Sequence, residues 1–161
     1  MDLDRTYLVG EVALIAMLPR DTLRVWLRRD YFEFDRPSGW KRFTFLETLT
    51  VCVFAEVVRR TKDHEVARQV ASIEFENWFQ NDRSASDCFV EFWRNRQEEL
   101  MVEQLVGLDR AQSVLRNSAL TETHDTFFYG FLNLSAIRQE FLGRMQAYQE
   151  GRLNEDGELS E

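Results

Sequence analysis

The sequence is poor in the residues that build most catalytic and metal sites. It holds only two cysteines and two histidines, which are separated along the chain: Cys52, His64, Cys88 and His124. Without a CxxC pair or a Cys/His cluster, the sequence offers no ligand set for zinc. It also lacks a glycine-rich phosphate loop, a nucleophile elbow and a motif of paired carboxylates. We therefore expect a protein that is not an enzyme, has no cofactor or metal, and keeps both thiols free and buried.

Long apolar runs are missing as well. No stretch of about 18 apolar residues occurs, so the sequence predicts no transmembrane helix. The first residues, MDLDR, carry acidic groups where a secretory signal carries basic ones, and we expect a cytoplasmic protein. Aromatic residues, by contrast, are frequent. With 13 Phe and 4 Trp, the 161 residues favour a packed globular protein over a disordered one.

Charge is distributed unevenly. The net charge of −8 comes mostly from residues 81–161, which carry −7, whereas residues 1–80 carry −1. Such an asymmetry is typical of a protein with two parts. Within the first half, the segment Pro19–Phe43 has seven basic and four acidic side chains and therefore a formal charge of +3. A cationic segment on an acidic chain is where a polyanion would bind.

Periodicity predicts two helices at the start of the chain. Tyr7–Met17 carries one apolar helical stripe, and Pro19 is expected to end that helix and open the next, Pro19–Arg29. Asp30 is expected to end the second helix in a left-handed conformation. That helix has an arginine ridge opposite an apolar side: Arg20, Arg24 and Arg28 against Leu23, Trp26 and Leu27. Such a helix fits a DNA major groove, although an ordinary solvated helix face has the same pattern.

A β-hairpin is predicted after this helix. Tyr31–Phe34 and Trp40–Phe43 have the composition of strands, and Pro37-Ser38-Gly39 has that of a turn. The hairpin would carry Lys41 and Arg42 near its tip, as a wing does.

Two more helices complete the first half. Thr44 and Glu47 form a capping box for a helix over Phe45–Arg60, which is apolar on nearly all sides and is therefore expected to be buried. Asp63 is expected to cap a fourth helix, from His64 to about Phe79.

Three motifs follow one another in this half: YLVGEVA at Tyr7–Ala13, TLRVW at Thr22–Trp26, and Arg36 followed by GWKRFT at Gly39–Thr44. In that order they resemble the motifs Y-x-I-G-E-V-A, T-L-R-Y-W and R-x-x-x-G-Y-R-x-Y-S of the MerR-type winged-helix transcriptional regulators. The resemblance covers roughly Tyr7–Ile73. It implies a winged-helix fold and sequence-specific binding of double-stranded DNA.

The match departs from the family at several positions. The family has Gly-Val-Ser in its first turn and a glycine after the second helix, where this chain has Met17-Leu18-Pro19 and Asp30. Val25 replaces a tyrosine, Leu27 replaces a glutamate, and Lys41 replaces an arginine, so positive charge is kept there without a bidentate fork. The fold tolerates these changes, whereas the details of DNA contact do not carry over.

The resemblance implies DNA contacts on two elements. On the second helix these are Arg20, Thr22, Arg24 and Arg28, and in the wing they are Arg36, Lys41 and Arg42. Two further positions stay open. Trp40 either braces the wing or touches a sugar, and Arg29 either contacts DNA or neutralises Asp30 or Glu33. Trp26 and Phe43 are expected in the core.

The second half has no heptad repeat that would form the long dimerisation helix of classical family members. After a polar linker at Asn81–Ser86, Cys88–Trp93 and Phe127–Leu134 have the composition of strands, with Gly130 marking a bulge or a close contact. Ser135 is expected to cap a helix over Ala136–Gln149.

Two segments between these strands stay ambiguous. Glu99–Val106 fits a strand or a helix, and Asp109–Asn117 is undecided. An aromatic cluster in this half fits a plain core, a dimer face or a small-molecule pocket. Its members are Phe89, Phe92, Trp93, Phe127, Phe128, Tyr129 and Phe131.

We predict an α+β protein with three parts. Residues 1–80 form a MerR-like winged-helix domain, residues 81–150 a small mixed α/β module of about three antiparallel strands and one long helix, and residues 151–161 a disordered acidic tail. The alternative for the middle part is an all-helical module.

The function that this sequence predicts is that of a nucleoid-associated transcriptional regulator. Its expected partners are double-stranded DNA, a second copy of the chain through the C-terminal module, and RNA polymerase or another protein. Two alternatives remain. One is an excisionase-like protein that bends DNA, and the other is a protein–protein adaptor that kept the winged-helix fold and lost DNA contact.

Overall fold

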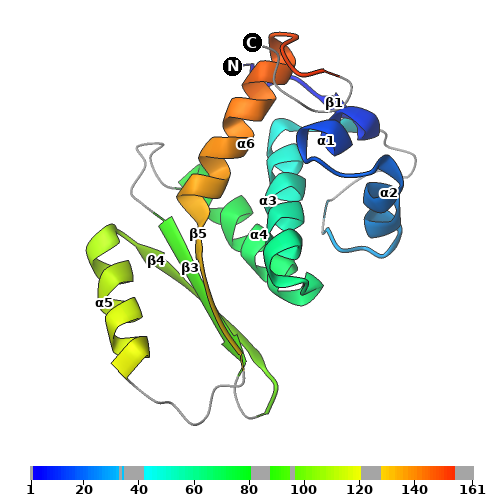
Figure 1. Cartoon of the computed structure of the whole chain (residues 1–161). Coiled ribbons are helices and arrows are strands. Elements are labelled where there is room, and N and C mark those ends of the chain that lie inside the picture. The colour runs from blue at the N-terminus through cyan, green and yellow to red at the C-terminus, as the bar shows by residue number, and fades with distance from the viewer. Residues whose placement is uncertain are drawn as a thin grey trace. The chain divides into compact units, whose positions relative to one another are not determined.

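A computed structural model of the chain describes residues 2–32, 34, 42–80, 88–94, 97–120 and 128–154. Within these ranges the chain forms six helices and two small antiparallel sheets, so the α+β class is confirmed (Figure 1). In chain order the elements are β1 (Tyr7–Leu8), α1 (Val9–Ile15), α2 (Arg20–Arg28), β2 (Arg42–Phe43), α3 (Phe45–Thr61), α4 (His64–Gln80), β3 (Cys88–Arg94), β4 (Leu100–Val106), α5 (Leu108–Leu120), β5 (Phe128–Asn133) and α6 (Leu134–Gln149).

The chain divides into two compact units at boundaries that differ from those expected. The first unit contains Met1–Phe75 and Arg138–Glu161, and the second contains Glu76–Ile137. The sequence-based boundaries, at residues 80 and 150, put all of α6 in the second module. From Arg138 onward α6 belongs instead to the first unit, because it packs on α1, which precedes it by more than 120 residues. A local sequence pattern does not say which distant helix a helix will contact.

α3 is the central helix of the first unit. It is buried on nearly all sides, as its apolar coat predicts, and Leu49 and Phe54 have no exposed surface. Its capping box is formed as expected, since the Thr44 hydroxyl accepts from the Glu47 amide at 3.2 Å and the Glu47 carboxylate accepts from the Thr44 amide at 2.7 Å. Asp63 caps α4 by accepting from two backbone amides in its first turn.

The β-structure of the first unit differs from the expected hairpin. Tyr7 and Leu8, expected in the first helix, form β1 and pair antiparallel with β2, Tyr7 with Phe43 and Leu8 with Arg42. Tyr31, Phe32 and Phe34, expected to form the other strand, are irregular. The physical reason is packing, because the Tyr31 and Phe32 rings lie 5.7 Å and 4.9 Å from the ring of Phe54 on α3. The expected turn, Pro37-Ser38-Gly39, lies outside the described residues.

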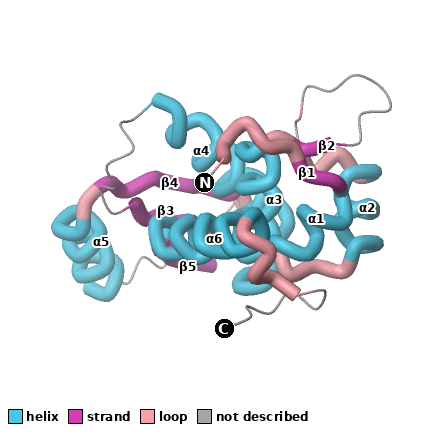
Figure 2. The backbone as a smooth tube through the Cα atoms, turned by 90° about the horizontal axis from the view of Figure 1, so that it is seen from above, coloured by secondary structure: helices cyan, strands magenta, loops and turns pink. Residues whose placement is uncertain are grey.

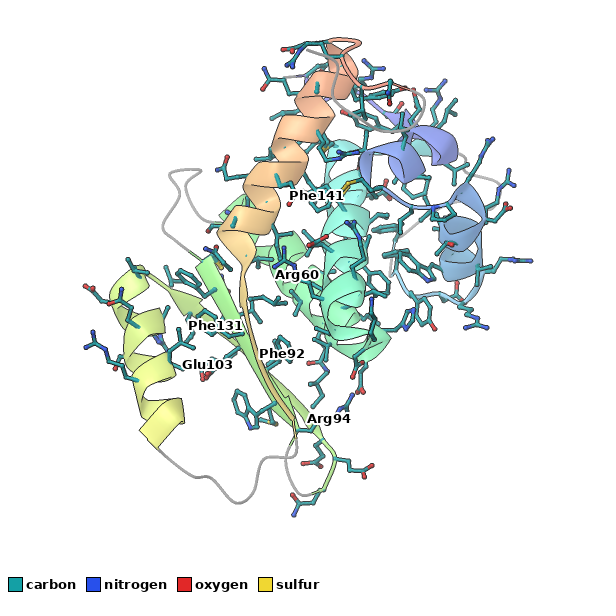
Figure 3. The ribbon with its side chains drawn as sticks, in the orientation of Figure 1. Arg60, Phe92, Arg94, Glu103, Phe131 and Phe141 are labelled. Carbon is teal, nitrogen blue, oxygen red and sulfur yellow. The ribbon has the colours of Figure 1, made fainter. Side chains whose placement is uncertain are left out.

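The second unit is a three-stranded antiparallel sheet with the strand order β4-β3-β5. Helix α5 covers one face, where Phe89, Leu105 and Ala111 form a core and Phe131 stacks on Phe89 at 5.4 Å. In Figure 3, Glu103 and Phe131 lie on the side of the sheet that carries α5. The segment Glu99–Val106 is thus largely a strand and Asp109–Asn117 lies in a helix. The all-helical alternative is wrong for this unit.

Gly130 marks a close contact and not a bulge. The pairing of β3 with β5 runs without interruption from Phe89–Asn133 to Arg94–Phe128, so no residue is inserted. A β-carbon on Gly130 would lie 2.1 Å from the Phe92 ring, which occupies the space that a side chain would need. This part of the aromatic cluster is therefore close-packed, since Phe92 is 2% exposed.

The first turn of α6 also corrects an expectation. The Asn133 side chain caps this helix, accepting from the Ala136 amide at 2.9 Å. Ser135 lies inside the helix, and its hydroxyl accepts from the Cys88 amide of β3 at 2.7 Å. Ser135 therefore does not cap the helix, because its hydroxyl is the hydrogen-bond acceptor for the backbone amide of Cys88.

Both cysteines are buried free thiols, as expected. Burial raises the pKa of the Cys52 thiol far above its usual range, so this sulfur stays protonated and unreactive. No helix in the described part of the chain is both long and apolar enough to cross a bilayer. Of the expected acidic tail, residues 155–161 lie outside the described residues, while residues 151–154 follow the last turn of α6.

Candidate nucleic-acid interface

Helix α2 is attached to the first unit by one apolar side. Leu23 is fully buried and Trp26 is 7% exposed, and the Trp26 ring meets the ring of Phe54 edge-on at 4.9 Å. His64, the first residue of α4, packs against the same tryptophan with ring centroids 6.0 Å apart. Burial of two such side chains stabilises the attachment of the helix by about 1.5–3 kcal/mol each. The inward side is therefore the one that periodicity predicts.

The opposite side of α2 carries the predicted arginine ridge. Arg20, Arg24 and Arg28 are all exposed, and Thr22 is half-buried between the ridge and the core. A shallow open hollow on this side is lined by Asp21, Arg24, Val25 and Arg28. Two guanidinium groups at the edge of one hollow form a local cationic surface on an acidic protein.

One acidic residue modifies this ridge. The Asp21 carboxylate pairs with the Arg24 guanidinium at 3.1 Å, with 89% and 52% of the two side chains exposed. An exposed pair of this kind contributes about 0–1 kcal/mol, so a phosphate group can replace the carboxylate. Asp21 was not among the predicted site residues, although the i,i+3 spacing to Arg24 in the sequence indicates the pair.

The turn between α1 and α2 has a left-handed residue where the resembling family has a glycine. Met17 has a φ of 52°. The Met17 amide donates to Leu14 at 3.1 Å and the Leu18 amide donates to Ala13 at 2.8 Å, the hydrogen-bond pair of a Schellman motif. Pro19 follows directly and precedes the first residue of α2. The turn thus ends one helix and starts the next within four residues.

α2 ends in the same way. Asp30 has a φ of 51°, as expected, and its amide and that of Tyr31 donate to the carbonyls of Leu27 and Trp26. This is the second position at which the family has glycine. An aspartate tolerates the left-handed conformation better than most side chains do.

We expect Met17→Gly to stabilise the protein by about 0.5–1 kcal/mol, because glycine adopts a positive φ without the steric cost of a β-carbon. Met17 is 38% exposed, so its removal sacrifices limited packing. Urea unfolding of the full chain measures the effect, and Met17→Ala, which keeps the β-carbon, is the matched control. Equal stability of the two variants would contradict the explanation.

The described part of the predicted wing contributes one cationic residue to the candidate interface. Arg42 is exposed on β2, and its guanidinium donates to the Thr6 hydroxyl at 3.4 Å, whereas Phe43 is buried as expected. Three predicted contact residues lie outside the described residues: Arg36, Trp40 and Lys41. Arg29 is described and exposed at the C-cap of α2.

The Arg20 guanidinium lies over the first turn of α1. A β-carbon built on Gly10 would be 3.6 Å from its central carbon, so the side chain reaches back from α2 to α1. Arg28 stands in the last turn of α2, where the helix dipole favours a cation. The ridge therefore extends from the α1–α2 junction to the far end of α2.

No metal site competes with this interpretation in the described ranges, which contain no group of three or more His, Cys, Asp and Glu side chains that could hold an ion. A scan against models of protein families and a search of curated proteins found no match to this chain.

Proposed function

We propose that this protein is a sequence-specific DNA-binding regulator of transcription that presents α2 to the major groove. The observation that carries the proposal is the exposed ridge of Arg20, Arg24 and Arg28 on a helix whose other side is fixed by buried Leu23 and Trp26. A rigid helix with donors on its free side can reach phosphates and base edges together. Arg42 on β2 supplies a second phosphate contact.

A MerR-like arrangement of this reader is part of the proposal. It is supported by the left-handed conformations of Met17 and Asp30, because these are the two positions where the family has glycine. A helix, a tight turn and a second helix with an exposed basic side also occur here in the order that the family has. The pairing of β1 with β2 is a further support, because Arg42 and Phe43, which would end the wing, pair with Leu8 and Tyr7 directly before α1.

The partners follow from the same proposal. The protein would act in the cytoplasm at the nucleoid, as a dimer formed through its C-terminal module, with RNA polymerase or another protein as a further partner. A net charge of −8 repels DNA as a whole, so non-specific binding would be weak and the local cationic ridge would select its site.

The experiment is selection of bound DNA by the full chain from a random-sequence duplex pool at low salt. The expected result is enrichment of inverted half-sites, because a two-fold dimer binds a pseudo-palindrome. Loss of affinity with rising salt should accompany it. A protein that retains no DNA at low salt would contradict the proposal. Strong bending of unrelated sequences would favour the excisionase-like alternative.

Asp21 provides a sharper test, because its carboxylate is the observation that favours an adaptor over a DNA reader. We expect Asp21→Asn to raise DNA affinity about 3- to 10-fold at low salt, since it removes a charge that repels phosphate and frees Arg24. Fluorescence anisotropy with a labelled duplex measures the change.

The matched control is Asp109→Asn, which removes the same charge from the first turn of α5. This variant should leave DNA affinity unchanged. An increase that is equal in both variants would show a general charge effect, and no increase for Asp21→Asn would favour the adaptor.

A further inference from the structure

Two arginine side chains hold the end of α1, immediately before the turn that leads to α2. The Arg144 guanidinium of α6 donates to the carbonyl of Ile15 at 2.8 Å and to that of Leu14 at 3.2 Å. The Arg59 guanidinium of α3 donates to the carbonyl of Ala16 at 2.8 Å. The last carbonyls of a helix have no intrahelical partner and carry the negative end of its dipole. Both arginines therefore put a positive charge at the negative end of the α1 dipole.

Arg144 is unusual in its burial. Only 9% of it is exposed, and burial lowers the pKa of its guanidinium, while the nearby Glu140 carboxylate favours the charge. A charged side chain is buried at this cost only where its donors are satisfied. Two of these donors bind carbonyls of α1, which makes Arg144 part of the turn's structure and not a surface residue.

A second contact, one helical turn along, fixes the direction of α1. Tyr148 of α6 donates to the Glu11 carboxylate at the start of α1, and Gln149 donates to the Tyr7 hydroxyl at 2.7 Å. Contacts of Arg144 with the end of α1 and of Tyr148 with its start define an antiparallel helix pair. Figure 2 shows α6 alongside α1 and α3 in this unit. In Figure 3, Phe141 of α6 lies beside α3.

We propose that Arg144 is a positioning residue for the DNA-reading helix: by holding the last carbonyls of α1 it fixes the turn from which α2 starts. Only four residues, 16–19, separate Ile15, whose carbonyl Arg144 holds, from Arg20, the first residue of the ridge. A change in the direction of the end of α1 therefore passes directly to α2. The inference rests on the proposed function for its DNA consequence, whereas the effect on the turn is independent of DNA.

The test uses the full chain with Arg144→Met and Arg144→Lys. Amide hydrogen exchange is measured at Leu18, whose N–H bonds the Ala13 carbonyl across the turn, and at amides of α3, which report global unfolding. DNA affinity is measured at low salt with a duplex enriched in the selection from the random-sequence pool, at a temperature where each variant is folded. Arg152→Met, at an exposed arginine just beyond α6, is the matched control.

Arg144→Met should speed exchange at Leu18 by about tenfold more than at α3, and should weaken DNA binding by about tenfold. Arg144→Lys should recover part of both, since an ammonium keeps the charge but not the fork. The control should change neither. If Arg144→Met does not fold, the lysine variant alone decides, by its local exchange at Leu18.

Equal acceleration at Leu18 and at α3 would overturn the proposal, because Arg144 would then add only global stability. Faster exchange confined to Leu18, with unchanged DNA affinity in a chain that binds DNA, would also overturn the proposal. If the selection with the wild-type chain enriches no duplex, the proposed function fails. The exchange measurement then decides alone: loosening confined to Leu18 supports the positioning role, and its absence overturns it.

Discussion

A fragment that ends at Gln80 is expected not to fold cooperatively, although it contains the whole region that resembles a winged-helix domain. It lacks α6, whose Phe141, Met145 and Ala147 are at most 1% exposed in the full chain. Burial of each large side chain contributes about 1.5–3 kcal/mol. The loss is a large share of the 5–15 kcal/mol that is typical for a whole domain. The fragment also lacks Arg144, so the end of α1 loses two hydrogen bonds from a charged donor.

The measurement is urea unfolding followed by far-ultraviolet circular dichroism, with amide dispersion in an NMR spectrum as a second readout. The fragment should show a shallow transition and poor dispersion, and the full chain a steep transition. Addition of a peptide spanning residues 138–161 should restore dispersion, because that segment completes the first unit. A matched control peptide with Phe141 replaced by Ser should not restore it. A fragment that unfolds with the midpoint of the full chain would contradict the expectation.

Features that depend on a few neighbouring residues were predictable from the sequence. The capping box of Thr44 and Glu47, the cap at Asp63 and the start of α2 after Pro19 all form as expected. Each is decided by hydrogen bonds or a fixed φ within one helical turn. The exposed arginine ridge was also predictable, because the 3.6-residue period of a helix puts its three arginines on one side of α2.

Features decided by distant residues were not predictable. Tyr7 and Leu8 continue the apolar stripe of α1, yet they form a strand because β2 offers them a partner. Serine is a common helix cap, yet the hydroxyl of Ser135 accepts from the Cys88 amide, which is 47 residues away. Arg144 is 129 residues from Ile15, and nothing near it in the sequence indicates that this arginine will be buried. The proposed contact residues can therefore be recognised in a short stretch of sequence. The contacts that would position them come from distant parts of the chain.

The proposed contact residues on α2 and β2 lead to a specific expectation for DNA binding. Arg24→Ala and Arg42→Ala should each weaken binding at low salt by about tenfold, because each removes one charged contact to a phosphate or base. The slope of log K against log salt should fall by about 0.9 for each lost phosphate contact. Because the two residues lie on α2 and β2, the double variant should lose close to the product of the two factors. Both side chains are exposed, so the free energy of unfolding should change by less than about 0.5 kcal/mol.

Anisotropy titrations at several salt concentrations, with urea unfolding of the same samples, separate the contact from stability. Arg152→Ala is the matched control, because Arg152 is an arginine of the same unit that pairs with Glu150 away from α2. It should leave both the affinity and the salt slope unchanged. If Arg24→Ala and Arg42→Ala bind as the wild-type chain does, α2 and β2 are not the DNA surface. If Arg152→Ala loses as much affinity as Arg24→Ala and Arg42→Ala, DNA is attracted by the overall charge of the protein and not by this ridge. At a true contact surface, loss of an arginine on the surface must cost more affinity than loss of an arginine elsewhere.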